Sequence, residues 1–498
     1  MTRGLLRVLH VASEITPWSQ TGGLGEVLSG LPPALAALDP ALAIAVVSPL
    51  YRVARERAAA RGAWFEDTGF EIAVAMPAAD RAARLLRLVS PAVGGAPSLA
   101  PLFFLDCPPL YDRDGVYGTA AGDHPDNAVR TAFLCRAAMA AAHRMLGGPA
   151  DLFHVHDWQA ALVPLYLRRL GGAARSIVTV HNLRYQGMFD GQTIVDVGLD
   201  WSLYTHDCLE HHGRASFLKG GMAAADVVTT VSPTYAAEIL TPRFGDSLDG
   251  FLRHDVKRVV GILNGIDAQA WDPATDASIP LHYSADHPAG KERCRDALAR
   301  ERGLRLDAGD LLLGVVTRLV EQKGSDLIAQ LAPELPALGA KLVLLGSGDD
   351  ALERRFRSLG EELPDHVSVE IGFDPGLARR IFAGSDAILM PSRFEPCGLT
   401  QLYAMRYGAI PIFNPVGGLR DTVVDPGDAA LASGQGTGFA MTDASTAALR
   451  RAVERAAHLH RDEPAGWPRL VRAAMRRDFS WRGPAGSYLS LYRQLHAA

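Results

Sequence analysis

Pro391-Ser-Arg-Phe-Glu-Pro-Cys-Gly-Leu-Thr-Gln401 is the stretch of this 498-residue chain that indicates its fold most directly. The preceding segment, Asp386-Ala-Ile-Leu-Met390, is short and apolar, as expected of a parallel strand buried on both faces. The residues from Gly398 to Met405 have the composition of a helix start. Glu395 and a run of backbone N–H groups therefore lie at the carboxyl edge of a parallel sheet. A carboxylate can bind sugar hydroxyls and amides can bind phosphate, so the stretch suggests a site for a sugar joined to a diphosphate.

Short apolar runs alternate with helical stretches along the whole chain, and this alternation predicts right-handed βαβ units. They form two sets, so we predict an α/β protein with two doubly wound, Rossmann-like domains facing each other across a cleft. The runs are Leu5–Ser13, Ala43–Ser48, Leu102–Leu105, Leu152–His156, Ser176–Val180 and Val227–Val231, then Leu311–Thr317, Lys341–Leu345, Val367–Ile371, Ala387–Met390 and Ala409–Phe413.

Glycines and a proline interrupt the pattern near residues 242–265, which indicates a domain boundary. We predict an N-terminal domain over residues 1–255 and a C-terminal domain over 256–479. The tail, 480–498, has aromatic and apolar residues at helical spacing and is expected to pack back on the first domain. A stretch around Trp64–Pro101 fits a strand-rich insertion better than another βαβ unit.

The composition excludes several functional classes. The formal net charge is −5 and 21% of the residues are charged, so the chain lacks the basic footprint of a nucleic-acid binder. It has no apolar run of about 18 residues and no signal-peptide pattern at its start. Five scattered cysteines form no Cys-x-x-Cys pair, which argues against a disulfide framework or a zinc knuckle. We expect a cytoplasmic protein that uses neither nucleic acid nor membrane as a partner.

A glycine pair follows the first apolar run, in Gln20-Thr-Gly-Gly-Leu-Gly25. Because glycine lets the backbone come close to a ligand, Gly22 and Gly23 before a helix can form a phosphate-approach loop. A plain tight turn explains the same residues. This motif alone does not separate the two interpretations.

Two cations occur in Thr317-Arg-Leu-Val-Glu-Gln-Lys-Gly324, after the first strand of the second domain. Lys323 is one of only five lysines in the chain, the rest of the 50 basic residues being arginine. Arg318 offers a planar fork of donors and Lys323 a mobile charge, and both suit a diphosphate at the sheet edge. A solvated loop in which neither cation binds anything is the alternative.

The motif His154-Val-His-Asp-Trp158 and the motif Val180-His-Asn-Leu183 each end an apolar run in the first domain. We expect no metal here, because His154 and His156 should face opposite sides of their strand and no zinc-ligand spacing is nearby. Asp157 and His181 fit hydrogen bonding to sugar hydroxyls. A helix cap or a satisfied turn is an equally good explanation of either residue alone.

A dozen segments, in order and over nearly the whole length, give the chain its resemblance to the bacterial glycogen synthases and plant starch synthases (glycosyltransferase family 5). They are Ser13-Glu14, Thr21-Gly-Gly-Leu24, His154-x-His-Asp-Trp158, Thr179-Val-His-Asn182, Tyr185-Gln-Gly-Met188, Ser216-Phe-Leu-Lys219, Val231-Ser-Pro-Thr-Tyr235, Leu263-Asn-Gly-Ile-Asp267, Arg318 with Lys323-Gly324, Pro391–Gln401, Gly417-Gly-Leu419 and Phe479-Ser-Trp481.

The resemblance implies the GT-B fold and a retaining transfer of glucose from ADP-glucose to the non-reducing end of an α-1,4-glucan such as glycogen, without a cofactor or a metal. By matching motif, it implies that Arg318 and Lys323 bind the donor phosphates, Glu395 the donor glucose, and Asp157 and His181 the sugar side. The remaining donor-binding positions that it implies are Gln20, Gly22, Gly23, Asn264 beside the reacting sugar, Phe373 beside the adenine, Cys397, Gly398, Leu399, Thr400, Gly417 and Gly418.

One position departs from the family pattern. The opening motif of the family usually reads Lys-Thr-Gly-Gly-Leu, and its lysine helps to hold the donor, whereas this chain has Gln20. A neutral amide binds phosphate more weakly than an ammonium group does. Two alternatives to an ADP-glucose-dependent synthase therefore remain: a transferase of the same fold that uses another donor such as UDP-glucose, and a glucan-binding protein with reduced catalysis.

Overall fold

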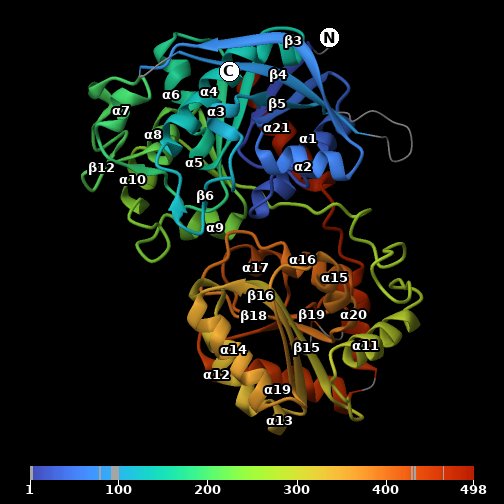
Figure 1. Cartoon of the computed structure of the whole chain (residues 1–498). Helices are drawn as coiled ribbons and strands as arrows, with labels where there is room; N and C mark the ends of the chain where they lie inside the picture. Colours follow the sequence, from blue (N-terminus) through green and yellow to red (C-terminus); the bar gives the residue numbers. More distant parts are fainter. Residues whose placement is uncertain are drawn as a thin grey trace. The chain divides into compact units, whose positions relative to one another are not determined.

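The computed structural model describes residues 4–77, 80–90, 100–427, 430, 433–463 and 465–497. The chain divides into two compact units (Figure 1). Unit 1 contains the residues up to Gly265 together with those from Trp481 on, and unit 2 is Ile266–Ser480. The division falls at Gly265 rather than at residue 255, because the strand β14 (Val259–Gly261) still pairs with the sheet of unit 1.

Unit 1 is built on one nine-stranded sheet. In the described part of this sheet, antiparallel pairing occurs only at one edge, where β4 pairs with β5 and with β3. This edge accounts for the strand-rich insertion expected around Trp64–Pro101. The order across the sheet is β14, β13 (Val227–Thr230), β9 (Arg175–Val180), β8 (Leu152–His156), β1 (Leu6–Val11), β2 (Leu42–Pro49), β5 (Leu102–Asp106), β4 (Arg81–Val89) and β3 (Trp64–Val74).

Helices cover both faces of this sheet. α1 (Gly23–Leu38) and α21 (Arg482–Ala497) pack together on one face, and α4 (Asn127–Leu146) lies on the other, beside α5 (Asp157–Ala160) and α6 (Leu162–Arg169). The shorter elements of unit 1 are α2 (Arg52–Ala60), α3 (Pro108–Tyr111), β6 (Gly118–Thr119), β7 (Gly122–Asp123), β10 (Met188–Phe189), α7 (Thr193–Asp196), β11 (Glu210–His211), β12 (Arg214–Ser216), α8 (Phe217–Ala224), α9 (Pro233–Glu238) and α10 (Asp249–His254).

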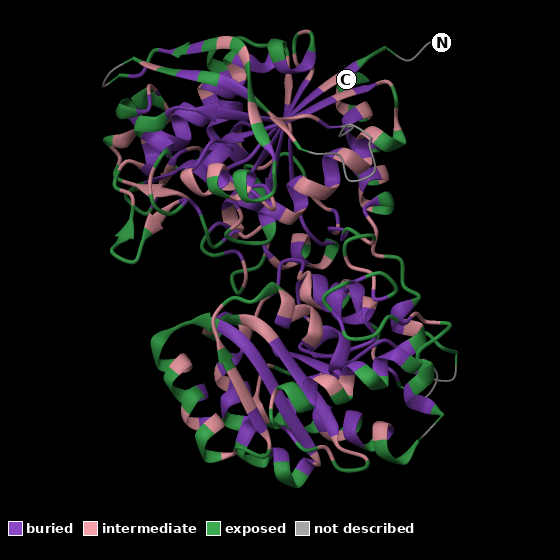
Figure 2. Ribbon diagram, turned by 45° about the vertical axis from the view of Figure 1, so that its right-hand side comes forward, coloured by how far each residue is buried: buried purple, intermediate pink, exposed green. Residues whose placement is uncertain are grey.

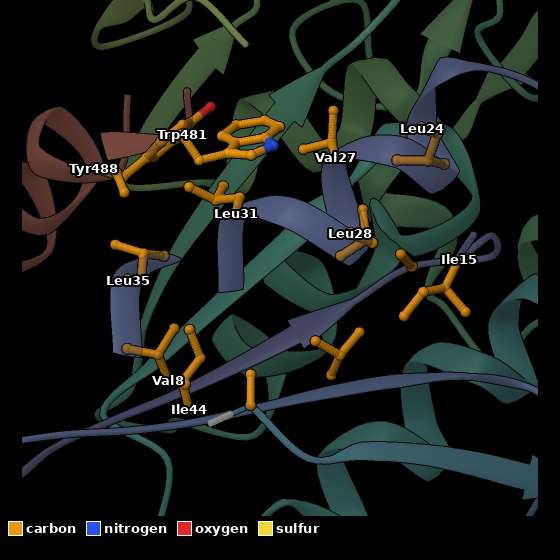
Figure 3. Packing of buried hydrophobic residues seen from close by; sticks show 14 of the residues in the cluster. Val8, Ile15, Leu24, Val27, Leu28, Leu31, Leu35, Ile44, Trp481 and Tyr488 are labelled. Atoms are coloured by element: carbon orange, nitrogen blue, oxygen red, sulfur yellow. The ribbon is translucent and has the colours of Figure 1, made fainter. Parts of the chain in front are cut away.

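The tail of the chain completes the core of unit 1. Figure 3 shows Leu28, Leu31 and Leu35 of α1 between the strand residue Val8 and the indole of Trp481. Trp481 is 5% exposed and precedes α21, so the last helix is fixed against the first one. The apolar face of α1 is therefore buried on two sides, by the sheet and by the tail.

Unit 2 is a six-stranded sheet in which every pair is parallel. Its central strands are almost completely buried (Figure 2). The order is β17 (Val367–Ile371), β16 (Ala340–Gly348), β15 (Leu311–Leu319), β18 (Ala387–Met390), β19 (Ile410–Phe413) and β20 (Phe439–Ala440).

Two groups of helices enclose the sheet of unit 2. One group is α11 (Ala289–Glu301), α15 (Pro375–Gly384), α16 (Thr400–Arg406) and α20 (Gly466–Met475), and the other is α12 (Ser325–Leu331), α13 (Leu335–Leu338), α14 (Asp350–Glu362) and α19 (Thr446–Asp462). The prediction of two doubly wound α/β domains is confirmed. Among the helices that the structure describes, none is long and apolar enough to cross a membrane.

Candidate active site

Two loops of unit 2 lie side by side at the carboxyl ends of neighbouring strands. One follows β15 and carries Lys323, and the other follows β18 and carries Glu395. Lys323 Nζ donates to Glu395 Oε2 at 2.6 Å, and Ser392 Oγ donates to the same oxygen at 3.0 Å. Glu395 is 5% exposed, so its charge is matched by a lysine in a largely desolvated place. The structure thus pairs two residues that the sequence assigned to different parts of one ligand.

Glycines allow these loops to touch backbone to backbone. A Cβ on Gly324, which has a φ of +69°, would lie 2.3 Å from the carbonyl oxygen of Pro391. A Cβ on Gly417 or Gly418 would lie 2.0 Å from the carbonyl oxygen of Glu395 or Cys397, respectively. The last two glycines begin α17 (Gly417–Thr422) directly against the Glu395 loop. These glycines therefore allow close packing of the two loops, whether or not their backbone amides also contact a phosphate.

The Glu395 loop is held by hydrogen bonds from the side chain of Gln401. Its side-chain Nε2 donates to the carbonyl oxygens of Cys397 and Gly398, both at 2.9 Å. Cys397 is buried, whereas Gly398, Leu399 and Thr400 are half-buried, and α16 begins at Thr400 rather than at Gly398. The predicted donor-binding residues of this stretch therefore form one turn, whose first two residues are held by Gln401.

Arg318 and Phe373 lie at the same sheet edge as this turn. Arg318 is the penultimate residue of β15 and is exposed. Phe373 follows β17 and is 85% exposed, an unusual state for a phenylalanine. An aromatic face presented to solvent is suited to stacking on a planar ring.

In unit 1, Asp157 and His181 lie at the ends of the neighbouring strands β8 and β9. Asp157 Oδ1 accepts a hydrogen bond from the backbone N–H of His181 at 2.7 Å, so the carboxylate holds the histidine loop. The expectation that His154 and His156 face opposite sides is wrong. Residues two apart on a strand share a face, and their ring centroids are 4.3 Å apart.

Asp157 combines backbone strain with a perturbed charge. Its φ is +54°, which is rare for a residue with a side chain and is found at functional sites. Burial raises the pKa of its carboxyl from 3.8 to about 7, with a smaller contribution from the nearby charge of Glu14. A carboxyl group that titrates near neutrality at a strand end is a functional-site candidate on physical grounds.

This pKa gives a testable pH dependence of stability. The folded pKa lies above the unfolded value, so the contribution of Asp157 is fully present at low pH and is lost as the pH rises from about 4 to 7. The amide introduced by Asp157→Asn cannot ionise. We expect the free energy of unfolding of wild type to fall relative to that of Asp157→Asn across this range, and the difference to stay constant at higher pH. Denaturant titrations of both proteins at several pH values measure this difference in the free energy of unfolding. The same pH dependence of stability in both proteins would contradict the raised pKa.

The opening loop of unit 1 is held by a residue to which the sequence analysis gave no role. Glu14 is buried, and its carboxylate accepts from Thr21 N at 2.6 Å, from Thr21 Oγ1 at 2.6 Å and from Gly22 N at 3.0 Å. Tyr117 donates to it as well, at 2.6 Å. The sequence feature that could have indicated this role is an acidic residue after the first apolar run and before two glycines. Gly22 and Gly23 are exposed, and α1 begins at Gly23.

Gln20 and Asn264 complete the predicted set in unit 1. Gln20 Nε2 donates to Glu26 Oε1 at 3.0 Å. A lysine at position 20 could form an ion pair with the same carboxylate. Asn264 is buried, and its Oδ1 has no hydrogen-bond partner within the part of the chain that the structure describes. An unpaired buried amide oxygen is costly unless a ligand completes it.

Comparison with known proteins shows the family to which the chain belongs. Residues 7–254 match the family model for the starch synthase catalytic domain, and residues 299–464 match that for glycosyl transferases group 1. The chain is 45% identical to a glycogen synthase of Anaeromyxobacter dehalogenans (strain 2CP-C), over 98% of this chain and 100% of that protein. It is 42% identical to a glycogen synthase of Syntrophotalea carbinolica, over 99% and 100%.

A solved structure is similar as well: the catalytic domain of starch synthase IV from Arabidopsis thaliana bound to ADP and acarbose. It superposes with a TM-score of 0.87 at 33% identity and covers 100% of both chains. The fold and these relatives therefore define a glycosyltransferase of the GT-B class. More specifically, the chain belongs to the glycogen synthase and starch synthase family and is a glucosyltransferase.

Proposed function

We propose that the protein transfers glucose from ADP-glucose to the non-reducing end of an α-1,4-glucan, with retention of configuration. The observation that carries this proposal is the pair of half-buried Lys323 and buried Glu395 at the carboxyl ends of the unit 2 strands, beside the glycines Gly417 and Gly418. A carboxylate for sugar hydroxyls, an ammonium for phosphate and accessible backbone amides are the groups that a nucleotide sugar requires. The ADP bound to the Arabidopsis starch synthase domain supports the choice of donor.

Each candidate residue has a role that its surroundings support. Arg318 and Lys323 bind the diphosphate, and they stabilise the charge that develops on it as the sugar departs. Glu395 accepts from glucose hydroxyls and, in the same position, orients Lys323. The exposed ring of Phe373 stacks on the adenine. The turn over Cys397, Gly398, Leu399 and Thr400 contributes backbone amides.

The residues of unit 1 act on the sugar. Asp157 fixes the loop of His181, and the unpaired Oδ1 of Asn264 accepts from the reacting sugar. Glu14 keeps Gly22 and Gly23 in the loop conformation that admits the donor. We assign no carboxylate nucleophile on the β-face. Retention is accounted for by substitution on the front face, in which the leaving phosphate takes the proton of the glucan hydroxyl.

Gln20 is the feature that favours the two alternatives, a different donor or a weakened catalyst. Its hydrogen bond to Glu26 keeps the side chain at the loop, where the amide can still bind an oxygen of the donor. Gln20→Lys is expected to lower the KM for ADP-glucose by about fivefold, because a charged hydrogen bond exceeds a neutral one by about 1 kcal/mol. The gain stays small because Glu26 pairs with the new lysine.

The deciding experiment is the initial rate of incorporation of labelled glucose into glycogen, from ADP-glucose and from UDP-glucose in parallel, with native protein and Gln20→Lys. We expect incorporation from ADP-glucose by both proteins. A preference for UDP-glucose would establish the alternative donor. No incorporation by native protein, with activity only in Gln20→Lys, would show that the natural chain has lost this chemistry.

A further inference from the structure

Hydrogen-bonding side chains continue from His181 into the core of unit 1. His181 Nε2 lies 3.0 Å from His156 Nδ1, and His156 Nε2 lies 3.1 Å from His10 Nδ1. His10 Nε2 then lies 3.3 Å from the hydroxyl of Tyr492, on α21. His10, His156 and Tyr492 are all completely buried. A candidate sugar-binding residue is thus connected to the last helix of the chain.

The same row of side chains continues past Tyr492. The Tyr492 hydroxyl lies 2.6 Å from His154 Nδ1, and His154 Nε2 lies 2.5 Å from Thr179 Oγ1. Thr179 Oγ1 lies 2.6 Å from Thr229 Oγ1, which ends the row. We call the side chains from His181 to Thr229 the histidine row. It spans β1, β8, β9, β13 and α21.

Every imidazole of the row is neutral. Burial lowers the pKa of His10 and of His181 to about 3, and it lowers the pKa of His154 and His156 well below the usual value. A neutral imidazole has one N–H donor and one acceptor nitrogen, and each hydroxyl of the row has one hydrogen. Each member therefore donates to one neighbour and accepts from the other. The direction of one hydrogen bond fixes the direction of all the others.

Only two directions are possible, and Thr229 distinguishes them. If His181 Nε2 carries the hydrogen, donation runs inward and ends at the Thr229 hydroxyl, which is completely buried and has no further acceptor in the described parts of the chain. A buried donor without an acceptor is strongly disfavoured. If donation runs outward, every buried hydrogen has an acceptor. The row then ends at His181, which is only half-buried and has its hydrogen on Nδ1.

We propose that Tyr492 is a positioning residue of this glucosyltransferase: through His10 and His156 it fixes His181 in the Nδ1–H tautomer, so that His181 donates to a hydroxyl of the glucose being transferred. The hydrogen bond from His181 to glucose rests on the proposed function, whereas the assignment of the His181 tautomer does not. Tyr492 accepts from His154 Nδ1 and donates to His10 Nε2, and a phenylalanine at this position does neither.

A metal ion is the competing explanation for three of these histidines. Ligand atoms of His10, His154 and His156 lie within 4.8 Å of one another. A metal requires a bare nitrogen from each ring at a common point. In the row, all ring nitrogens of these three residues already face a hydrogen-bonding partner, so binding of a metal would break it.

The test compares Tyr492→Phe with Tyr166→Phe. Tyr166 is also buried in unit 1, but it lies outside the histidine row. Its hydroxyl donates to the carbonyl oxygen of Val197 at 2.7 Å, and Tyr166→Phe removes this hydrogen bond. The tautomers are read from nitrogen NMR of full-length protein labelled on histidine, with His181→Gln used to assign the His181 signal. Melting temperature, kcat and KM for ADP-glucose are measured on the same proteins, together with their metal content.

We expect native protein and Tyr166→Phe to show His181 with the hydrogen on Nδ1, and Tyr492→Phe to show a mixture of tautomers. With similar melting temperatures for both variants, only Tyr492→Phe should lose about five- to tenfold in kcat, the size of one hydrogen bond. A native His181 protonated on Nε2, an unchanged tautomer in Tyr492→Phe, or a stoichiometric transition metal would overturn the proposal. Absence of glucosyl transfer by native protein, with the expected tautomers, would refute the proposed function and leave the row intact.

Discussion

Replacing Lys323 with alanine is expected to lower kcat by about 10² to 10³-fold, the largest effect on turnover that the structure indicates. The loss of one preorganised donor at a site of developing charge costs about 3 to 4 kcal/mol of transition-state stabilisation. Lys323 is held for that task by the hydrogen bond of 2.6 Å to Glu395, in a place where water competes little. Arg318→Ala should have a loss of the same order, because it removes the second cation at the carboxyl end of β15.

Lys323→Ala also leaves the Glu395 carboxylate buried without its cation, so stability falls as well. Lys341→Ala is the matched control. Lys341 is a buried lysine of unit 2 that lies 3.7 Å from Asp310 and donates to the Asp365 carbonyl at 3.0 Å, but it is at the amino end of β16. Steady-state rates at a temperature where all proteins are folded separate the two effects. A kcat for Lys323→Ala within threefold of wild type would remove Lys323 from the reaction.

Much of the fold could be predicted because parallel strands are continuous apolar runs. Runs such as Leu152–His156 and Val367–Ile371 coincide with β8 and β17. The strands β14 and β20 were not predicted, because they are only three and two residues long, too short to show a hydrophobic period. The boundary shifted for the same reason, since β14 carries the chain past residue 255 before unit 1 ends.

The candidate residues could be placed at strand ends from the sequence, but their contacts with one another could not. Glu395 and Lys323 could each be placed at a strand end, yet nothing local to either residue indicates that they pair across 72 positions of sequence. Glu14 was missed because two of its four donors are backbone amides, which leave no pattern of residue types, and a third, the Tyr117 hydroxyl, is 103 positions away in the sequence. The expected opposite orientation of His154 and His156 was wrong, because side chains alternate along a strand with a period of two, which places residues two apart on the same face.

The largest loss of stability is expected from Trp481→Ala. Truncation of a buried tryptophan costs about 3 to 5 kcal/mol, and Trp481 is 5% exposed between α1 and α21. Urea unfolding measures the change, with Trp201→Ala as control, because Trp201 belongs to the same unit and is 48% exposed. The control should change by a smaller amount, about 1 kcal/mol, because only part of its ring is buried. Equal stabilities of the two variants would mean that the tail adds nothing to unit 1.

The contact itself can be isolated through Gly30, which faces the indole from α1. A Cβ at residue 30 would lie 2.0 Å from Trp481 Nε1, so Gly30→Ala should destabilise the native protein although alanine is favoured in a helix by about 1 kcal/mol. Once Trp481→Ala has removed the ring, that clash is absent and only the helix preference remains. Gly30→Ala should then stabilise the protein, and the double-mutant cycle should show a reversal of sign. Additive effects would place the indole elsewhere and would detach α21, with Tyr492, from the face of α1.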